Sequence, residues 1–321
     1  MQLHNLFEGL TPDIRETRAH VSIPTTRLVG IEVEVENAQQ IRDSKYWAVK
    51  GDSSLRNNGV ELVLRQPLGG ADLRDSLQQL TGILRAAPDC NVSERCSLHV
   101  HVDVRDFSTT QLAALLLAYV GSEAALYMQG GKDRYDNIYC PGVTAALEQM
   151  SLMRSVVHGN SDNVRHAIRR WQKYTGINLH SVQERGSVEF RAHEGTLEVP
   201  RIMRWVSILL LLVDYAATVK SPSTVLKHIR TGPEEYITRV FGSYSRQLLE
   251  DGVYFEYYQN NLLNAIDLMV NEEFKPKRNP KYAGPSTAGD ANVEEILAAL
   301  DAAVRAASAE NIAVATPTER G

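Results

Sequence analysis

Three segments of the chain alternate strictly between apolar and polar residues. They are 30–36 (GIEVEVE), 98–104 (LHVHVDV) and 188–193 (VEFRAH). A period of two is typical of β-strands, because successive side chains point to opposite faces of a sheet. Each segment therefore predicts a strand with one apolar face and one face that carries ionisable groups. We expect the third to carry Glu189, Arg191 and His193 together on its polar face.

Two further strands are predicted close to these three. Residues 59–64 (GVELVL) form an apolar run that contains Glu61. Residues 174–181 should begin a strand that returns, through a tight turn at 184–186, into the strand of Glu189. Asp52 lies in a Gly-Asp-Ser turn signal, where a turn or capping role is the simplest explanation.

The rest of the chain is mainly helical by its apolar spacing. Helices are predicted at 71–86, 111–128, 143–171, 199–218, 223–229, 233–250, 254–272 and 293–307. The fold class is therefore α+β, with an antiparallel sheet backed by helices. We expect a lead-in segment over 1–26, a catalytic domain over 27–220, and a helical C-terminal region over 221–321 with a linker near 275–290 and a frayed tail.

Composition narrows the functional classes. The 321 residues are 43% hydrophobic and 23% charged, as in soluble globular proteins, and the net charge of −5 comes without a lysine or arginine block. We therefore expect no nucleic-acid groove. The three cysteines show no CxxC spacing, which disfavours a disulfide framework or zinc ribbon and favours a reducing, cytoplasmic location. No signal peptide is recognisable, and the apolar run 205–217 is too short to span a bilayer.

The polar faces of the strands carry a set of side chains that suits a metal. Carboxylates are the preferred ligands of magnesium and manganese, and a histidine is compatible with them. The candidate ligands are Glu32, Glu34, Glu61, His99, His101 and Glu189. A solvated sheet face is the competing explanation for the glutamates, and Glu61 at a water-facing edge position is equally open.

Other kinds of site find less support in the sequence. There is no P-loop, no glycine-rich dinucleotide fingerprint and no recognisable Ser–His–Asp arrangement. A nucleotide would therefore be held chiefly by metals and by arginines such as Arg191. The loop 134–142 mixes basic and aromatic residues, so Arg134 is a candidate nucleotide contact, although a solvated loop explains it equally well.

The order and spacing of these motifs resemble the amidoligase family, carboxylate–amine ligases of the glutamine synthetase and glutamate–cysteine ligase superfamily. The resemblance covers about residues 28–217. It rests on GIEVE at 30–34, Trp47 with DSSL at 52–55, GVE at 59–61 with Pro67-Leu68, LHVHVD at 98–103, Tyr174 with NLH at 178–180, and SVEFRAHEGT at 187–196. The sequence departs from the family pattern at Leu64-Arg65-Gln66, where a serine- or proline-rich approach to Pro67 is expected.

The resemblance implies a curved antiparallel sheet of the glutamine synthetase-like type, whose polar face forms a funnel. It implies ATP- and magnesium-dependent formation of an amide through an acyl phosphate. By similarity Glu32, Glu34, Glu61, Glu189 and one of the two histidines would hold magnesium. Arg191 would contact phosphate, with Arg134 and Asn178 as further nucleotide contacts, and Asp52 and His193 would serve the substrate or the proton of the amine.

Three alternatives stay open at this point. A metal-dependent hydrolase of a phosphate ester or amide would use the same ligands without a nucleotide. A cupin-like barrel would need a glutamate soon after His101, where the sequence has Asp103-Val104-Arg105-Asp106. An adaptor protein would simply expose its charged strands to solvent. The sequence names neither the carboxylate donor, the amine acceptor nor the oligomeric state.

Overall fold

We describe the protein from a computed structural model. The structure describes residues 1–11, 16–131, 134, 137, 140–145, 147–219, 221–250 and 253–269. Residues 1–269 belong to one compact unit. The expected linker near 275–290, the helix at 293–307 and the frayed tail lie outside the described residues.

The centre of this unit is a six-stranded sheet. Its strands are β1 (Val29–Val35), β2 (Trp47–Gly51), β3 (Val60–Leu64), β4 (Ser97–Asp103), β5 (Ile177–Asn178) and β6 (Ser187–Glu194). Their order across the sheet is β2-β3-β1-β4-β6-β5, and every neighbouring pair is antiparallel. The predicted α+β class with an antiparallel sheet is therefore confirmed, and the three alternating segments are adjacent strands.

Helices occur in each of the predicted helical segments up to residue 269, but the segments 143–171 and 233–250, each predicted as one helix, contain two helices each. They are α1 (Gly70–Arg85), α2 (Thr109–Gly130), α3 (Leu147–His158), α4 (Ser161–Arg170), α5 (His180–Arg185), α6 (Val199–Thr218), α7 (Pro222–Ile229), α8 (Pro233–Phe241), α9 (Ser245–Leu249) and α10 (Val253–Met269). Short 3₁₀ turns occur at Leu3–Asn5, Val143–Ala145 and Gly242–Tyr244.

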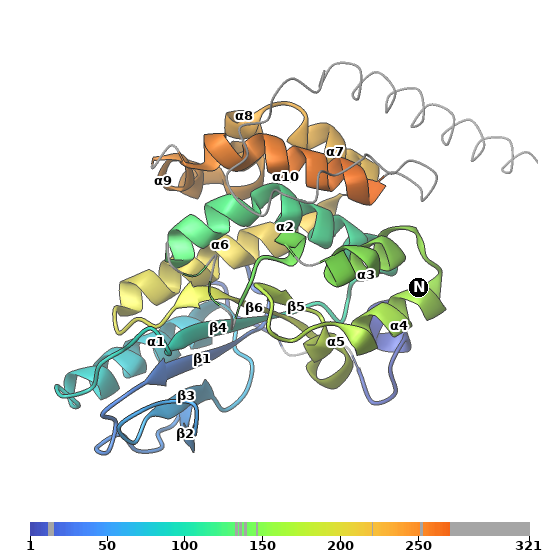
Figure 1. Cartoon of the computed structure of the whole chain (residues 1–321). Coiled ribbons are helices and arrows are strands. Elements are labelled where there is room, and N and C mark those ends of the chain that lie inside the picture. The colour runs from blue at the N-terminus through green and yellow to red at the C-terminus, as the bar shows by residue number, and fades with distance from the viewer. Residues whose placement is uncertain are drawn as a thin grey trace, which may run out of the picture. The chain divides into compact units, whose positions relative to one another are not determined.

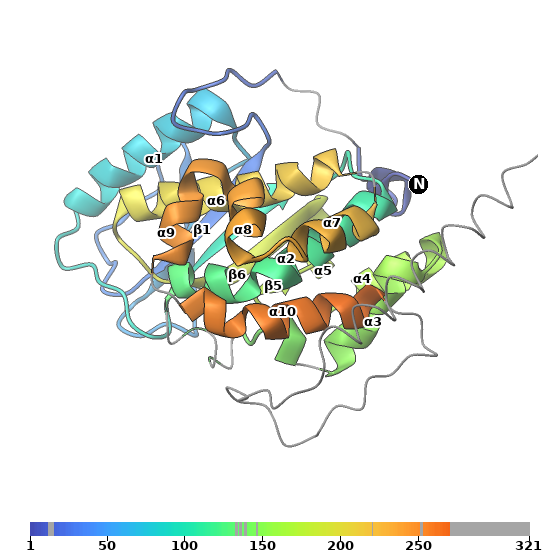
Figure 2. The ribbon, with the colours of Figure 1, turned by 90° about the horizontal axis from the view of Figure 1, so that it is seen from above.

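Helices α2 and α6 cover one face of the sheet, and further helices form a second layer behind them (Figure 1). Helices α2 and α6 contact β6 and β4, and α7 and α10 lie on the far side of α2 (Figure 1 and Figure 2). The apolar sides of the strands face the first layer: Phe190 of β6 is fully buried, with its ring centroid 6.1 Å from that of Tyr119 in α2. This arrangement leaves the opposite face of the sheet for the ionisable residues.

Helix α2 is apolar on nearly all of its sides because it is enclosed between the sheet and the outer helices. By length and composition it is long and apolar enough to cross a membrane, but most of it is buried inside the protein. Its N-terminus is fixed by a capping box, in which the Ser108 side chain accepts from the Gln111 N–H and the Gln111 side chain accepts from the Ser108 N–H. We interpret α2 as a core helix.

The predicted division at residue 220 does not separate compact units. Helix α10 lies along α2, and the buried Tyr236 hydroxyl of α8 donates to the Ala118 carbonyl of α2 at 2.8 Å. The helices after residue 220 therefore complete the core behind the sheet. The sequence did not predict this packing, because the pattern of an amphipathic helix indicates that one side is buried but not which element buries it.

The predicted hairpin turn at 184–186 is wrong. Residues His180–Arg185 form the short helix α5, and β5 pairs with β6 through two residues only. Gly186 ends α5 with φ = 68°, a left-handed conformation that glycine adopts without steric cost. This helix carries Arg185 to the polar face of the sheet, where a tight turn would not have placed it.

Glu123 in α2 gives a testable pH dependence. Its carboxylate accepts from the Val143 N–H at 2.7 Å and from the Thr144 hydroxyl at 2.6 Å, yet burial raises its pKa to about 7. Because the pKa of Glu123 is higher in the folded than in the unfolded chain, the protonated form of Glu123 stabilises the fold. This stabilisation is fully present below about pH 4.5 and is lost as the pH rises through about 7. Relative to Glu123→Gln, the unfolding free energy of the wild type should fall by about 2–3 kcal/mol between pH 5 and pH 8.

Urea unfolding of both proteins at several pH values measures this difference. Equal pH slopes for the wild type and Glu123→Gln would show that Glu123 ionises normally in the folded protein.

Candidate active site

The register of the strands brings the predicted polar residues onto one face. Glu32 of β1 lies opposite His99 of β4, and His101 of β4 lies opposite Glu189 of β6. Directly opposed residues in antiparallel strands project from the same face. These four side chains therefore meet, as predicted. None of them is more than 8% exposed, so a solvated sheet face does not explain their charges.

Glu32 is the residue to which most of the others connect. Its Oε2 lies 3.4 Å from Nδ1 of His99, and its Oε1 lies 3.4 Å from Nε2 of His101 and accepts from Nη1 of Arg185 at 2.9 Å. Burial acts to raise the pKa of Glu32, but its contacts with the two histidines outweigh burial and hold that pKa well below its usual range. Glu32 is therefore a carboxylate, with both oxygens directed at neighbouring groups.

Two donor groups that share Glu32 could each hold a metal ion. One consists of Glu32, His101 and Glu189, and the other of Glu32, Glu61 and His99, with the ligand atoms of each group within 4.8 Å of one another. Nε2 of His99 is buried and has no hydrogen-bond partner within the described part of the chain. Carboxylate oxygens with one imidazole are a donor set that suits magnesium or manganese.

Glu34 and Glu61 face each other across β1 and β3. Burial raises the pKa of Glu34, and Oε2 of this residue accepts from the Ser97 N–H at 2.7 Å. Burial and the neighbouring charge of Glu32 raise the pKa of Glu61 to about 8. Closely spaced carboxylates resist ionisation together unless a cation joins them, so these residues fit a cation site.

Arg191 lies beside the carboxylates on β6. Its Nη1 donates to Oε1 of Glu189 at 2.5 Å, and Oε2 of Glu189 accepts from Nδ2 of Asn178 at 2.6 Å. The guanidinium carbon is 5.7 Å from the ring centroid of Tyr174, which is 49% exposed. Nε of Arg191 is buried without a hydrogen-bond partner among the described residues. A guanidinium with a free donor beside a cation site suits an anionic group such as a phosphate.

His193 does not lie on this face, and the prediction that it does is wrong. The β4–β6 register shifts between Leu98 and Val100, so that Leu98 pairs with His193 while Val100 pairs with Phe190. Three steps on β6 thus match two on β4, and such a bulge reverses the alternation. The His193 ring lies 5.1 Å from that of Trp205 in α6, within the helix layer.

The surroundings of His193 suit packing better than proton transfer. Burial lowers its pKa to about 3, and its Nδ1 donates to the Glu194 carbonyl at 2.6 Å. We expect His193→Phe to keep the activity of the protein within about twofold of the wild type, because the ring contact with Trp205 is retained. The lost hydrogen bond should cost about 1 kcal/mol of unfolding free energy. Abolished turnover in a stably folded variant would restore a chemical role for His193.

Two further predicted site residues have structural contacts. The Asp52 carboxylate accepts from the Ser54 N–H at 2.8 Å, as a turn residue does, although its charge also contributes to the raised pKa of Glu34. Arg134 is only 3% exposed, and its Nη2 donates to the Ser97 hydroxyl and to the Arg191 carbonyl. Arg134 therefore supports the strand segment that carries Arg191, and its burial excludes the solvated loop as an explanation. Its role as a nucleotide contact stays a prediction.

Sequence reasoning missed Arg185, which donates to Glu32 and whose Nη1 lies 3.2 Å from Nε2 of His101. A signal for it was present, since a basic residue followed by glycine, as in Arg185-Gly186, is typical of a helix end. It also missed Ser187, whose hydroxyl lies 3.2 Å from Nδ1 of His101.

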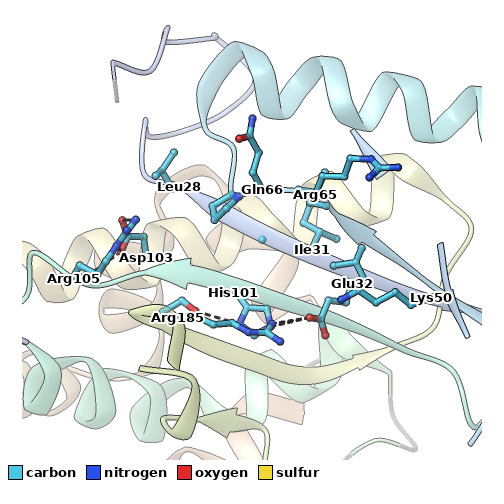
Figure 3. Close-up of a pocket in the computed structure, with 15 residues that line it drawn as sticks. Leu28, Ile31, Glu32, Lys50, Arg65, Gln66, His101, Asp103, Arg105 and Arg185 are labelled. Atoms are coloured by element: carbon cyan, nitrogen blue, oxygen red, sulfur yellow. Dashed lines mark hydrogen bonds and ion pairs between the residues drawn. The ribbon is translucent and has the colours of Figure 1, made fainter. Parts of the chain in front are cut away.

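A cavity of about 360 Å³ opens beside Glu32 and His101 (Figure 3). It reaches along β1 to the segment around Gln66 and Pro67, and Gly30 forms part of its wall. A side chain at Gly30 would crowd His101, because an added Cβ would lie 3.3 Å from the His101 Cβ. The cavity therefore adjoins the candidate metal ligands directly.

The fold and the site together define an α+β protein with a buried carboxylate–histidine–arginine site on the open face of an antiparallel sheet. A family profile described as "putative amidoligase enzyme" matches residues 25–213. The chain belongs to this amidoligase family, as the resemblance of its motifs indicated, and the family points to an amide-bond-forming ligase. No curated protein matches the chain.

Proposed function

We propose that this protein is an ATP- and magnesium-dependent carboxylate–amine ligase, with a sheet of the glutamine synthetase-like type. The observation that carries the proposal is the pair of donor groups sharing Glu32, with Arg191 next to them on the same face. A ligase of this kind must hold a polyphosphate and neutralise its charge, and carboxylate-bound cations together with an arginine are suited to both tasks.

The roles of the residues follow from their contacts. The magnesium ions would be held by four carboxylates and two imidazoles, namely those of Glu32, Glu34, Glu61, Glu189, His99 and His101. Bound magnesium would neutralise the phosphates and polarise the γ-phosphoryl group. Arg191 would donate to that phosphoryl group, and Asn178 would keep Glu189 oriented through its 2.6 Å hydrogen bond. The bidentate capacity of a guanidinium suits a phosphoryl oxygen pair.

The proposed reaction has two steps. An oxygen of the donor carboxylate attacks the γ-phosphorus of ATP, the bond to the β-phosphate oxygen breaks, and an acyl phosphate and ADP form. The amine then attacks the acyl carbon, phosphate leaves with the electron pair of the C–O bond, and the nitrogen loses a proton to give the amide. Burial of the site limits hydrolysis of the acyl phosphate by water.

Trapping the acyl group tests this proposal. We would incubate the protein with ATP, magnesium chloride, hydroxylamine and a panel of carboxylic acids, and measure hydroxamate and ADP. We expect equal amounts of both products with at least one acid, and none when ATP or magnesium is omitted. ATP-independent release of phosphate or of an amine from esters or amides would instead favour a metal-dependent hydrolase.

A further inference from the structure

The last residue of α5 contacts two of the candidate metal ligands at once. Nη1 of Arg185 donates to Oε1 of Glu32 at 2.9 Å and lies 3.2 Å from Nε2 of His101, and these two ligand atoms are 3.4 Å apart. Figure 3 shows the guanidinium beside both side chains. Glu32 and His101 form one of the two donor groups together with Glu189. Arg185 therefore contacts a carboxylate and an imidazole that a metal ion in this group would use.

The contact with His101 is incompatible with metal ligation through Nε2. A guanidinium only donates hydrogen bonds, so Nε2 of His101 accepts from Arg185 with its one lone pair. The other ring nitrogen, Nδ1, lies 3.2 Å from the Ser187 hydroxyl, which is able to accept its proton. A neutral imidazole in this tautomer is the form that ligates a metal through Nε2. Arg185 and a metal ion therefore compete for the same lone pair.

The charges in this donor group also favour an exchange of cations. Each of its two carboxylates is matched by one guanidinium, because Glu32 pairs with Arg185 at 2.9 Å and Glu189 pairs with Arg191 at 2.5 Å. The two guanidinium charges together equal the charge of one divalent ion. A divalent ion added to this group would be repelled by both guanidinium groups. Departure of one of them relieves this repulsion.

Arg185 is better placed to leave than Arg191. The side chain of Arg185 is 52% exposed, whereas that of Arg191 is 15% exposed. A half-exposed guanidinium can exchange its carboxylate partner for water at little cost in free energy. The backbone of α5 need not move, since the fully buried Val182 anchors this helix and the long side chain of Arg185 provides the freedom.

We propose that Arg185 is a resident counter-cation of the site, and that a divalent metal ion displaces it from Glu32 and His101 on binding. Arg185 thereby lowers the metal affinity of this donor group. The proposal rests on the cation site that the proposed function includes, but not on ATP or on amide formation. A different role, in which Arg185 orients Glu32 for the metal, predicts the opposite effect when the guanidinium is removed.

Calorimetric titration with manganese chloride, without a nucleotide, tests this exchange. We expect Arg185→Gln to bind manganese about five- to tenfold more tightly than the wild type. Apparent affinity falls in proportion to the fraction of protein that is able to bind, so this factor corresponds to an Arg185 contact formed roughly 80–90% of the time. Weaker or unchanged manganese binding in the variant would overturn the proposal.

Arg65→Gln is the matched control for the loss of a positive charge. Arg65 lines the same cavity, but it donates to the Asp43 carboxylate and the Ser44 carbonyl rather than to a candidate metal ligand. We expect its manganese affinity to stay within about twofold of the wild type. An equal gain in Arg65→Gln and Arg185→Gln would show that the net charge of the cavity sets the affinity, and would overturn the exchange.

Anomalous diffraction from wild-type crystals soaked in manganese chloride tests the exchange without any variant. We expect manganese on Nε2 of His101, with the Arg185 side chain turned away from Glu32. Manganese bound at the site while Arg185 still contacts Nε2 of His101 would overturn the proposal. Tighter manganese binding by Arg185→Gln, in a protein that never binds ATP, would contradict the ligase function and support the exchange.

Discussion

Replacing Glu32 by glutamine should lower magnesium-dependent activity by roughly 100-fold or more. Glu32 belongs to both donor groups, and its two oxygens are directed at His99 and His101. The amide of glutamine has nearly the same shape but lacks the charge, so the variant loses affinity for cations without opening a cavity. The measurements are hydroxamate formation and ATP turnover over a range of magnesium concentrations, together with thermal unfolding in the absence of metal.

Glu36 provides a matched control for Glu32. It continues the same alternating segment and is buried, but its Oε1 accepts from the Arg56 N–H at 2.9 Å, and it belongs to neither donor group among the described residues. A glutamine at position 36 retains this acceptor oxygen. Glu36→Gln should therefore keep the magnesium dependence of the wild type. Equal losses in both variants would mean that net charge, rather than metal ligation, explains the effect.

Replacing Arg191 by glutamine should lower kcat by roughly 10²–10³-fold and affect ATP affinity much less. This is the range expected when one group that stabilises charge in a transition state is removed. The unpartnered Nε of Arg191 and its position beside Glu189 are the basis for this role. Single-turnover formation of ADP, compared with the dissociation constant for ATP, separates the two effects.

Arg201 is a suitable control for this experiment. It lies on α6 and pairs with Glu194 at 2.7 Å, so Arg201→Gln removes an ion pair close to the end of β6 without touching the polar face. It should retain full activity. Full activity in Arg191→Gln would contradict a phosphate-binding role for Arg191, and we would then seek the phosphate contact at Arg185.

The sequence predicted the sheet and most of the site because alternation fixes which side chains share a face. The period of two correctly predicted that five side chains lie on the polar face of the sheet, namely those of Glu32, His99, His101, Glu189 and Arg191. The distances between these side chains depend on the order of the strands, which the alternation of residues does not determine. The resemblance to a known family supplied the expectation that these strands are neighbours. The physical cause of their convergence is the antiparallel register of β1, β4 and β6.

The errors have specific structural causes. The position of His193 depends on a bulge that no glycine or proline marks within β6, so the alternation VEFRAH gave no warning. Arg185 was missed because the six residues of α5 are too few to show a helical period, and the Arg185-Gly186 helix-end signal was not used.

Calorimetric titration of ATP, with and without magnesium, tests the ligase proposal most directly. The site predicts binding in the micromolar range that requires magnesium and is strongly weakened in Glu32→Gln. Absence of binding at millimolar ATP with magnesium present, in a folded wild-type protein, would contradict the proposed ligase. The same carboxylates and histidines would then be assigned to a metal-dependent hydrolase that acts without a nucleotide.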